Sequence, residues 1–488
     1  MSKRIASLLM LLVLVSAVLA ACGAPTTTTT TTETTGAAGA ATTVETTAAE
    51  TTAAETATEI MAETAAETAT TVMEETATTA ETATAGETAT EVGMAGETAT
   101  AGATAGATAA AEPLPNVGGL NLGPIKIASQ SPLSGPQAQF GGNARNGAEL
   151  GIQQLGQQMG FTNVQFAPFD DQAQEPVGAA NASTIAADQQ ILCVVGHVNS
   201  GVALAALPTY RDANLVMISP ANTNPRVTEE FDGTGYRVVG RDDVQGVVAA
   251  DFAKNNLNAQ NAYVLHDQTA YGEGLATVFR DHAQSIGINI AGFAGTQETS
   301  VFDAVLTPIQ AANPDLVFFG GIYDRGGPLV QQMRERGIQA KFLGGDGLDA
   351  SDFVRLGGEG AVGANYVTVS GPASAYPAAA QFIQDYQAKY NQPAAYPAFQ
   401  AYDSAQACLR AIANAAIDAN GMPTREQVKA ALEELGPYDG VTGRVAFNDE
   451  GDRDPATYYI FEVASADPAQ WANNRVAGSI EAEPPAGD

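Results

Sequence analysis

The sequence contains few of the side chains that bind metals or build disulfide frameworks. Its 488 residues include three histidines and three cysteines, which do not form the paired Cys/His pattern of a zinc site. We therefore expect neither a metal nor a cofactor. Cys193 lies in a predicted strand and Cys408 in a predicted helix, so we expect both to pack in the core and neither to be a catalytic nucleophile.

Basic residues are also scarce. The chain has 22 Lys and Arg against 54 Asp and Glu, a formal net charge of -32. Because nucleic acids are polyanions, this balance argues against a nucleic-acid partner. Outside residues 1–119, acidic residues still outnumber basic ones about two to one, so the globular part carries the excess as well.

The longest apolar run, residues 5–19, is too short to cross a bilayer comfortably. Lys3 and Arg4 precede it, and the small residues Leu19-Ala20-Ala21 lead to Cys22, which is the pattern of an export signal at residues 1–21. The position of the cysteine resembles the bacterial lipobox. We therefore expect Cys22 to be the lipidated N-terminus of a mature protein anchored at the outer face of the cytoplasmic membrane.

Residues 23–119 contain no aromatic residue, Lys or Arg. They consist mainly of Thr, Ala, Glu and Gly, with 14 Glu and a recurring Glu-Thr-Ala-Thr motif. Such a segment has too little apolar surface to build a core, and repulsion between like charges keeps it extended. We expect residues 22–121 to be a disordered tether, whose threonine clusters are candidate sites for O-linked glycans.

From residue 122 onward, short apolar runs alternate with longer stretches at helical spacing. This alternation is typical of an α/β fold with mostly parallel sheets. Strands are predicted at residues 125–129, 164–169, 191–195, 215–219, 262–266, 288–293, 315–320, 341–345 and 365–370. Because the globular part is too long for one comfortable core, we expect two doubly wound lobes.

After residue 370 the pattern changes to helices followed by a hairpin. The predicted helical segments are residues 376–389, 398–418 and 424–435, and the predicted hairpin is residues 443–463. The expected domains are an N-terminal lobe of residues 122–241 plus 370–440, a C-terminal lobe of residues 242–369 plus 441–465, and a C-terminal tail of residues 466–488. The segment after residue 370 must be shared between the lobes.

Two small, polar and uncharged loops follow predicted strands, at residues 194–201 and 218–225. In open parallel sheets, ligands bind beyond the carboxyl ends of the strands, where loops lead into helix N-termini. Backbone N–H groups and the hydroxyls of Ser200 and Thr223 would form a neutral cradle for a carboxylate, whereas a phosphate site would more often contain Lys or Arg. Capping and turn formation explain either loop alone better, but the two together favour a binding site.

An acidic residue follows another predicted strand. Asp346 lies in a glycine-rich turn, where it could meet an ammonium group or simply form the turn. Tyr271 projects from a strand-to-helix loop that begins with His266 and Asp267. These two residues invite an acid–base interpretation, but no nucleophile motif accompanies them, and such pairs usually bond to each other or to the backbone.

Two further motifs are rejected. Gly358, Gly360 and Gly363 have dinucleotide-loop spacing but lead from a helix into a strand, which is the wrong order. Residues 448–454 lack the spacing and the final Glu of a calcium loop, and they are better explained as a hairpin turn.

Six segments occur in an order and separation that carry a family resemblance: SPLSGPQAQFG (131–141), VVGHVNSG (194–201), MISPANTNP (217–225), HDQTAYGEGLA (266–276), VFFGG (317–321) and FLGGDG (342–347). They resemble the branched-chain amino acid binding proteins of ABC importers, which have the type I periplasmic-binding fold. The resemblance covers roughly residues 122–465. It implies two α/β lobes that are joined by three crossovers and close around an amino acid.

The resemblance also implies roles for residues of the two loops. Ser200 and Thr223 would hold the ligand carboxylate, and the Ala221 carbonyl would accept from its ammonium group. Asn222, in the same loop, is a further candidate. Asp346 would supply the balancing negative charge from the other lobe.

The remaining implied contacts concern closure and the ligand side chain. Tyr271 would assist closure, and Phe140 falls where the family has an aromatic wall. Ile322 stands where leucine/isoleucine/valine-binding proteins place a tyrosine, with Tyr323 next to it, which predicts a wider or differently shaped pocket.

A second departure concerns a disulfide that, in those proteins, joins the loop after a pair of aspartates to the cysteine before the binding serine. This chain has no cysteine near Asp171 and has Asn199 at the second position, so we expect hydrogen bonds to hold that loop.

These observations predict a lipid-anchored, non-enzymatic protein that captures a small zwitterion, such as a branched-chain or other apolar aliphatic amino acid, for the transmembrane subunits of an ABC importer. One alternative keeps the fold but binds an amide, urea or an aromatic or other organic acid. A second is a ligand-sensing receptor module, and a third is an exported hydrolase that uses His266 and Asp267.

Overall fold

The computed structural model describes residues 112–485. The expected signal peptide, the expected lipidation at Cys22 and most of the expected tether therefore lie outside the described residues. Among residues 112–485, no helix combines the length and the apolar character that a membrane crossing requires.

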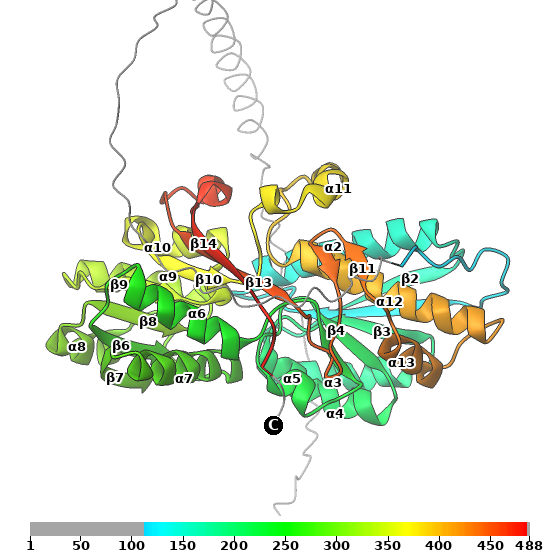
Figure 1. The fold of residues 1–488 in the computed structure, drawn as a ribbon, viewed down its shortest axis with the longest axis horizontal. Coiled ribbons are helices and arrows are strands. Elements are labelled where there is room, and N and C mark those ends of the chain that lie inside the picture. The colour runs from blue at the N-terminus through cyan, green and yellow to red at the C-terminus, as the bar shows by residue number, and fades with distance from the viewer. Residues whose placement is uncertain (1–111, 486–488) are drawn as a thin grey trace, which may run out of the picture. The chain divides into compact units, whose positions relative to one another are not determined.

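The first sheet has five parallel strands in the order β2-β1-β3-β4-β5. The strands are β1 (Ile125–Ser131), β2 (Val164–Asp170), β3 (Ile191–Gly196), β4 (Val216–Ser219) and β5 (Gly235–Arg237). Every residue of β3 and β4 is buried, because helices cover both faces of the sheet. The helices around it are α2 (Ala138–Gln158), α3 (Glu175–Ala187), α4 (Ser200–Asp212), α5 (Arg226–Glu229), α12 (Ala398–Asp418) and α13 (Arg425–Glu433) (Figure 1).

The second sheet has seven strands in the order β14-β13-β10-β9-β8-β6-β7. Its parallel part is β6 (Asn261–His266), β7 (Asn289–Gly295), β8 (Leu316–Gly320), β9 (Lys341–Gly344) and β10 (Asn365–Thr368). β13 (Ala456–Glu462) and β14 (Arg475–Ala482) complete it as antiparallel strands. Its helices are α6 (Asp242–Asn255), α7 (Ala270–Ser285), α8 (Asp303–Ala312), α9 (Tyr323–Glu335) and α10 (Ser351–Gly357).

The chain crosses between the two sheets and their helices in three segments. The first joins β5 to α6, the second joins β10 to α11 (Ala380–Tyr390), and the third joins β12 (Gly443–Val445) to β13. β12 pairs with β11 (Tyr438–Gly440) in a separate two-stranded ribbon. Two mostly parallel sheets with three crossovers are the architecture that the sequence predicted.

Close contact between α2 and α12 explains why residue 147 is a glycine. A Cβ atom on Gly147 would lie 2.0 Å from the carbonyl oxygen of Ala398, so a larger side chain there would force the helices apart. α12 is buried on nearly all sides and rich in alanine, which suits a helix enclosed by other elements. Packing against α12 therefore holds α2 in place, and the first turn of α2 borders the candidate site.

The expectation that Cys193 and Cys408 only pack in the core is wrong, because the two residues form a disulfide. Both side chains are fully buried, and their Cα atoms are 5.8 Å apart. The bond joins β3 to α12 across 215 residues of sequence. A disulfide agrees with the export signal, because disulfides persist in oxidising compartments outside the cytoplasm.

The prediction of a hairpin at residues 443–463 is also wrong, because its two strands do not pair with each other. β12 pairs with β11, and β13 pairs with β10 and β14, so the two expected partners join different sheets. A tight turn remains between them, with a bridge between Phe447 and Arg453. The segment expected to be a C-terminal tail contains β14 at the edge of the second sheet. Its mostly exposed side chains lack the apolar alternation that identifies a strand in sequence.

Candidate functional site

Loops at the carboxyl ends of strands from both sheets surround one pocket with an empty volume of about 320 Å³. Its lining residues come from the loops after β3, β4, β6, β8 and β9, from α2, and from the loop before α12. They are Phe140, Val198, Asn199, Ser200, Ala221, Tyr271, Ile322, Asp346, Gly347 and Tyr396. Six of the eight residues expected from sequence are among them. Asn222 and Thr223 are not, although both are fully buried next to them.

Asp346 is the charged residue in this pocket, and three side chains hold its carboxyl group. Tyr271 donates to Oδ1 at 2.8 Å, Gln245 to Oδ1 at 3.0 Å, and Tyr396 to Oδ2 at 3.0 Å. The side-chain oxygen of Gln245 in turn accepts from the Asp346 backbone N–H at 3.0 Å. Burial raises the pKa of Asp346, while these hydrogen bonds oppose the rise. The carboxyl group is therefore fixed in position and short of a positive partner.

A second buried carboxyl group, Asp242 at the start of α6, lies near Asp346. Burial and the Asp346 carboxylate raise the pKa of Asp242 well above its usual value, against the opposing effects of the Thr223 hydroxyl and Arg237. The backbone N–H of Asp242 also donates to the Thr223 carbonyl at 2.8 Å. The two neighbouring carboxyl groups thus disfavour each other's ionised form, and a cationic group beside Asp346 would relieve this effect.

The opposite side of the pocket carries neutral donors. Ser200 is the first residue of α4, and Asn199 occupies the N-cap position without a capping hydrogen bond from its side chain. The Asn199 side chain instead donates to Gln137 at 2.8 Å. Because the first N–H groups of a helix have no intrahelical acceptor, this end of α4 suits an anionic group. The start of α4 thus lies in the neutral loop that the sequence analysis singled out.

Hydrogen bonds join the loops after β3 and β4. The Ser219 hydroxyl donates to the His197 carbonyl at 3.1 Å and accepts from the Asn222 N–H at 2.7 Å. The Asn222 side chain donates to the Val198 carbonyl at 2.9 Å. Asn222 therefore holds the two loops together, and the structure gives it no place in the pocket wall.

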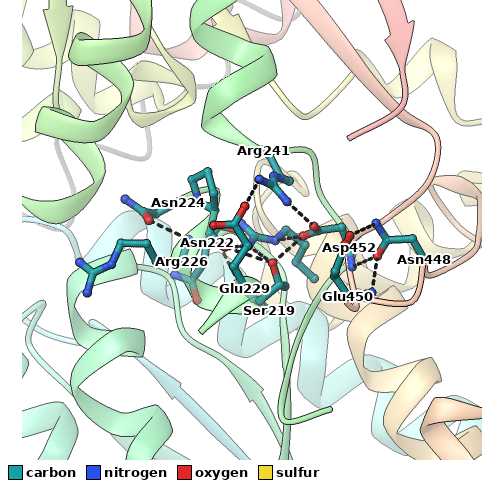
Figure 2. A network of polar contacts seen from close by, with 12 residues as sticks. Ser219, Asn222, Asn224, Arg226, Glu229, Arg241, Asn448, Glu450 and Asp452 are labelled. Carbon is teal, nitrogen blue, oxygen red and sulfur yellow. Dashed lines mark hydrogen bonds and ion pairs between the residues drawn. The ribbon is translucent and has the colours of Figure 1, made fainter. Parts of the chain in front are cut away.

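A buried network of ion pairs and hydrogen bonds holds the loop after β4. Arg237, which is fully buried, donates to the carbonyls of Asn222 at 3.0 Å and Pro225 at 3.3 Å, and its Nε lies 2.6 Å from Asp452. Asp452 also pairs with Arg241 at 2.9 Å, and Figure 2 shows Arg241 bonded to both Asp452 and Glu229. Asp452 belongs to the third crossover and Arg241 to the first, so the network joins two crossovers to the candidate ligand loop.

Aromatic side chains form the wall beside Phe140. Its ring packs edge-on against Tyr323 at 4.9 Å and Tyr396 at 5.5 Å between centroids. Tyr323 donates its hydroxyl to the Pro136 carbonyl at 3.1 Å, while Ile322 lines the pocket. Tyr323 thus supports the wall from outside the pocket, and an aliphatic side chain stands at the position where the resemblance implied a tyrosine.

The loop after β2 is held by polar contacts, as expected for a chain without a cysteine near Asp171. The Asp171 carboxyl accepts from the Ala173 N–H at 3.0 Å and lies 3.4 Å from Nδ1 of His197. Both Asp171 and His197 are fully buried. This contact connects the loop after β2 to the loop that carries Ser200.

His266 and Asp267 bond to the backbone of their own loop. His266 accepts from the Gln268 N–H at 3.3 Å, and Asp267 accepts from the Thr269 N–H at 3.0 Å and the Thr269 hydroxyl at 2.6 Å. Neither residue lines the pocket around Asp346. Both residues therefore stabilise the loop that leads into α7.

Sequence reasoning missed three residues of the site: Gln245, Asp242 and Tyr396. Asp242 and Gln245 start a helix, where acidic residues are ordinary, so nothing local marked them. Tyr396 lies in the loop before α12, far in sequence from every motif that was recognised. Within residues 112–485, no group of His, Cys, Asp and Glu could hold a metal ion.

Comparison with known proteins identifies the family. Residues 124–468 match the family described as periplasmic binding protein. The chain belongs to this family. The Leu/Ile/Val-binding protein homolog 2 of Brucella abortus is 28% identical over 348 residues, which cover 71% of this chain and 92% of that relative. An amino acid binding protein of Pseudomonas aeruginosa is 30% identical over 346 residues, covering 70% and 90%.

Solved structures confirm the type I periplasmic-binding fold. The leucine binding protein LivK of Thermotoga maritima has a TM-score of 0.65 at 25% identity, covering 73% of this chain and 98% of LivK. LivJ of Streptococcus pneumoniae, in complex with isoleucine, has a TM-score of 0.63 at 24% identity, covering 74% and 100%. A solute binding protein of R. palustris, in complex with benzoate, has a TM-score of 0.64 at 18% identity, covering 75% and 98%. Membership of this family places the protein outside the cytoplasm.

Proposed function

We propose that the protein captures an amino acid with an apolar aliphatic side chain outside the cytoplasm and delivers it to the transmembrane subunits of an ABC importer. Asp346 carries the proposal. Its carboxyl group is fixed by Tyr271, Gln245 and Tyr396, and it lies in the same pocket as Ser200 at the N-terminus of α4. A pocket with one anionic and one anion-binding side suits a zwitterion.

In this proposal the ligand ammonium group binds Asp346, and its positive charge offsets the effect of Asp346 on the neighbouring Asp242. The carboxylate binds the N–H groups at the start of α4 and the Ser200 hydroxyl. Thr223 is also proposed to hold the carboxylate. The Ala221 carbonyl is proposed to accept a hydrogen bond from the ammonium group. Phe140 and Ile322 contact the ligand side chain, where their apolar surfaces favour an aliphatic group.

The proposal favours an amino acid over a simple organic acid such as the benzoate found in the R. palustris structure. A purely anionic ligand would bring negative charge toward Asp346 and would leave that buried carboxyl group without a positive partner. Uncompensated burial of a carboxylate costs several kcal/mol. The relatives that are named as Leu/Ile/Val-binding and amino acid binding proteins support the same ligand class.

The proposal includes anchoring through lipid on Cys22, followed by the acidic tether of residues 22–121. This arrangement would keep the binding domain close to an importer in the same membrane. The proposal has no catalytic role for the chain, because the family members it resembles bind solutes and release them unchanged.

Mass spectrometry of the small molecules retained after gentle purification tests the proposal without a choice of ligand. We expect an apolar aliphatic amino acid to be enriched with the wild-type chain and absent from an Asp346→Asn preparation made in parallel. Retention of an organic acid or an amide in its place would refute the amino-acid assignment while leaving the solute-binding role intact.

A further inference from the structure

A larger cavity lies next to the pocket around Asp346, with Tyr396 contributing to the walls of both. Its empty volume is about 860 Å³, compared with about 320 Å³ for that pocket. Five aromatic residues line it: Tyr366, Tyr396, Phe399, Phe461 and Trp471. One carboxyl group, that of Asp349, completes the wall, and we call this space the Asp349 cavity.

Asp349 has neutral partners in this cavity. Its Oδ2 accepts from the Thr368 hydroxyl at 2.9 Å and its Oδ1 accepts from the Trp471 indole N–H at 3.2 Å. A carboxylate can accept about four hydrogen bonds, so capacity remains for a further donor. Among residues 112–485, no Lys, Arg or His lines the cavity and none forms an ion pair with Asp349. Asp349 therefore has no ion-pair partner among the described residues, although Arg145 lines an adjoining cavity that Asp349 also borders.

The aromatic walls, like Asp349, attract a positively charged ligand. The ring of Tyr366 stacks between Phe461 and Trp471, at 5.4 Å from each. Aromatic faces carry partial negative charge and attract cations, most strongly where water is excluded. Burial raises the pKa of Asp349 to about 7, while the hydrogen bonds from Thr368 and Trp471 oppose the rise.

Within residues 112–485, no basic side chain lines this cavity or the pocket around Asp346. That pocket has the N-terminus of α4 to receive a carboxylate. The lining of the Asp349 cavity, all within the described residues, offers no basic side chain, so a zwitterion would place its carboxylate there without an ion-pair partner. An amine without a carboxylate avoids this cost.

We propose that the Asp349 cavity is a second ligand site, which binds an organic ammonium ion that lacks a carboxylate. The ammonium group meets the Asp349 carboxyl, and the hydrocarbon part of the ligand packs against the aromatic walls.

Three probes of matched size test the proposal with the full chain: butylamine, butanol and butyrate. Trp471 is the single tryptophan of the sequence, and its indole N–H donates to Asp349, so its fluorescence and its indole N–H resonance report on binding at this carboxyl group. We expect a saturable change with butylamine, and at least tenfold weaker binding of butanol and butyrate. Equal responses to the three probes, or none to butylamine, would overturn the proposal.

Matched substitutions test the role of Asp349. Asp349→Asn should weaken butylamine binding at least tenfold, whereas Asp352→Asn, the same change at a carboxyl group that lines neither pocket, should alter it less than twofold. Phe399→Leu keeps an apolar wall but removes a ring, and it should weaken butylamine two- to threefold, which tests the aromatic contribution even if Asp349→Asn does not fold. Unchanged butylamine affinity in both Asp349→Asn and Phe399→Leu would contradict the assignment.

The wild-type chain gives a pH test that needs no substitution. The titratable groups that act on Asp349 are Asp346, Tyr366 and Tyr396, and the two tyrosines stay neutral because burial raises their pKa values well above the usual range. Ionisation of Asp349 around pH 7 should therefore increase butylamine affinity about tenfold between pH 6 and pH 8, while the amine stays protonated. A flat or falling profile would overturn the proposal.

Discussion

At the scale of single residues, the candidate site depends on where buried charge lies. Asp346 and Asp242 are both at most 4% exposed, and neither has a basic residue as a hydrogen-bond partner among the described contacts. Burying two nearby carboxyl groups costs free energy, because each disfavours the ionised form of the other. A ligand ammonium group would offset that cost, so ligand binding and protonation should be linked.

We therefore predict that amino-acid affinity falls on acidification well above the usual pKa of aspartate, which is about 4. Burial raises the pKa of Asp346 and of Asp242, so these groups gain protons and lose their attraction for an ammonium group as pH falls through the raised values. Calorimetry between pH 8 and pH 5 should show weakening affinity, with protons released on binding. An affinity that stays constant down to pH 4 would contradict the linkage.

At the scale of elements, the loop after β4 is supported by the third crossover. Arg237 holds carbonyls of that loop while pairing with Asp452. The side chains of Asp452 and Arg237 are both nearly inaccessible to solvent. The side chain of Glu229, which also pairs with Arg241, is 40% exposed. The same network therefore contains a buried ion pair and a solvated one.

We predict that Asp452→Asn lowers the free energy of unfolding by about 3–5 kcal/mol, because it leaves the Arg237 charge buried without a partner. Glu229→Gln is the matched control and should cost less than about 1 kcal/mol, since exposed ion pairs contribute little. Urea denaturation monitored by circular dichroism measures both. Similar small losses for the two variants would show that the buried pair does not support the fold.

The disulfide between β3 and α12 leads to a prediction at the same scale. Cross-linking residues 215 positions apart restricts the unfolded chain, so replacing both Cys193 and Cys408 with alanine should cost about 2–5 kcal/mol. Peptide mapping of the exported chain without reductant should find the two cysteines in one cross-linked peptide. Free thiols at both positions in fully denatured, unreduced protein would show that the bond does not form.

Particular residues explain which parts of the site could be predicted from sequence. Ser200, Tyr271 and Asp346 follow strands, and the carboxyl ends of parallel strands are where ligand loops gather, so local patterns were sufficient. Tyr396 and Gln245 reach Asp346 from elements without such a signal. Their contribution depends on tertiary contacts, which strand and helix periodicity does not encode.

The same limit applies to the elements. The parallel strands were predicted because they are buried apolar runs. β14 was missed because most of its side chains are exposed, and the Cys193–Cys408 bond was missed because periodicity says nothing of which strand meets which helix. An even pair of cysteines beyond an expected lipidated one, in an exported chain, was the available signal.

At the scale of the whole molecule, the proposal requires the binding domain to stay near a membrane importer. We predict that Cys22→Ser releases the protein into the soluble extracytoplasmic fraction, because a diacyl anchor buries many methylene groups at about 0.8 kcal/mol each. Fractionation followed by immunoblotting measures the change, and Ser16→Ala within the apolar run is a suitable control that should stay attached. Membrane attachment of Cys22→Ser equal to wild type would refute lipid anchoring.

The fold alone does not name the ligand. Structures of similar fold hold isoleucine in one case and benzoate in another, and both fit this chain with TM-scores above 0.6. What distinguishes the two classes is charge in the pocket, where an amino acid needs a negative group for its ammonium. The central claim is therefore that Asp346 recognises an ammonium group.

Calorimetry with matched ligands tests that claim most directly: leucine, its des-amino analogue 4-methylpentanoate and its amide, each against the wild type and Asp346→Asn. The account predicts that the wild type binds leucine more than tenfold tighter than either analogue. It also predicts that Asp346→Asn loses about 2–5 kcal/mol of leucine affinity, because the ammonium loses a charge-assisted hydrogen bond. Equal affinity for leucine and 4-methylpentanoate, together with unchanged leucine binding by Asp346→Asn, would contradict the account and favour an organic acid as the ligand.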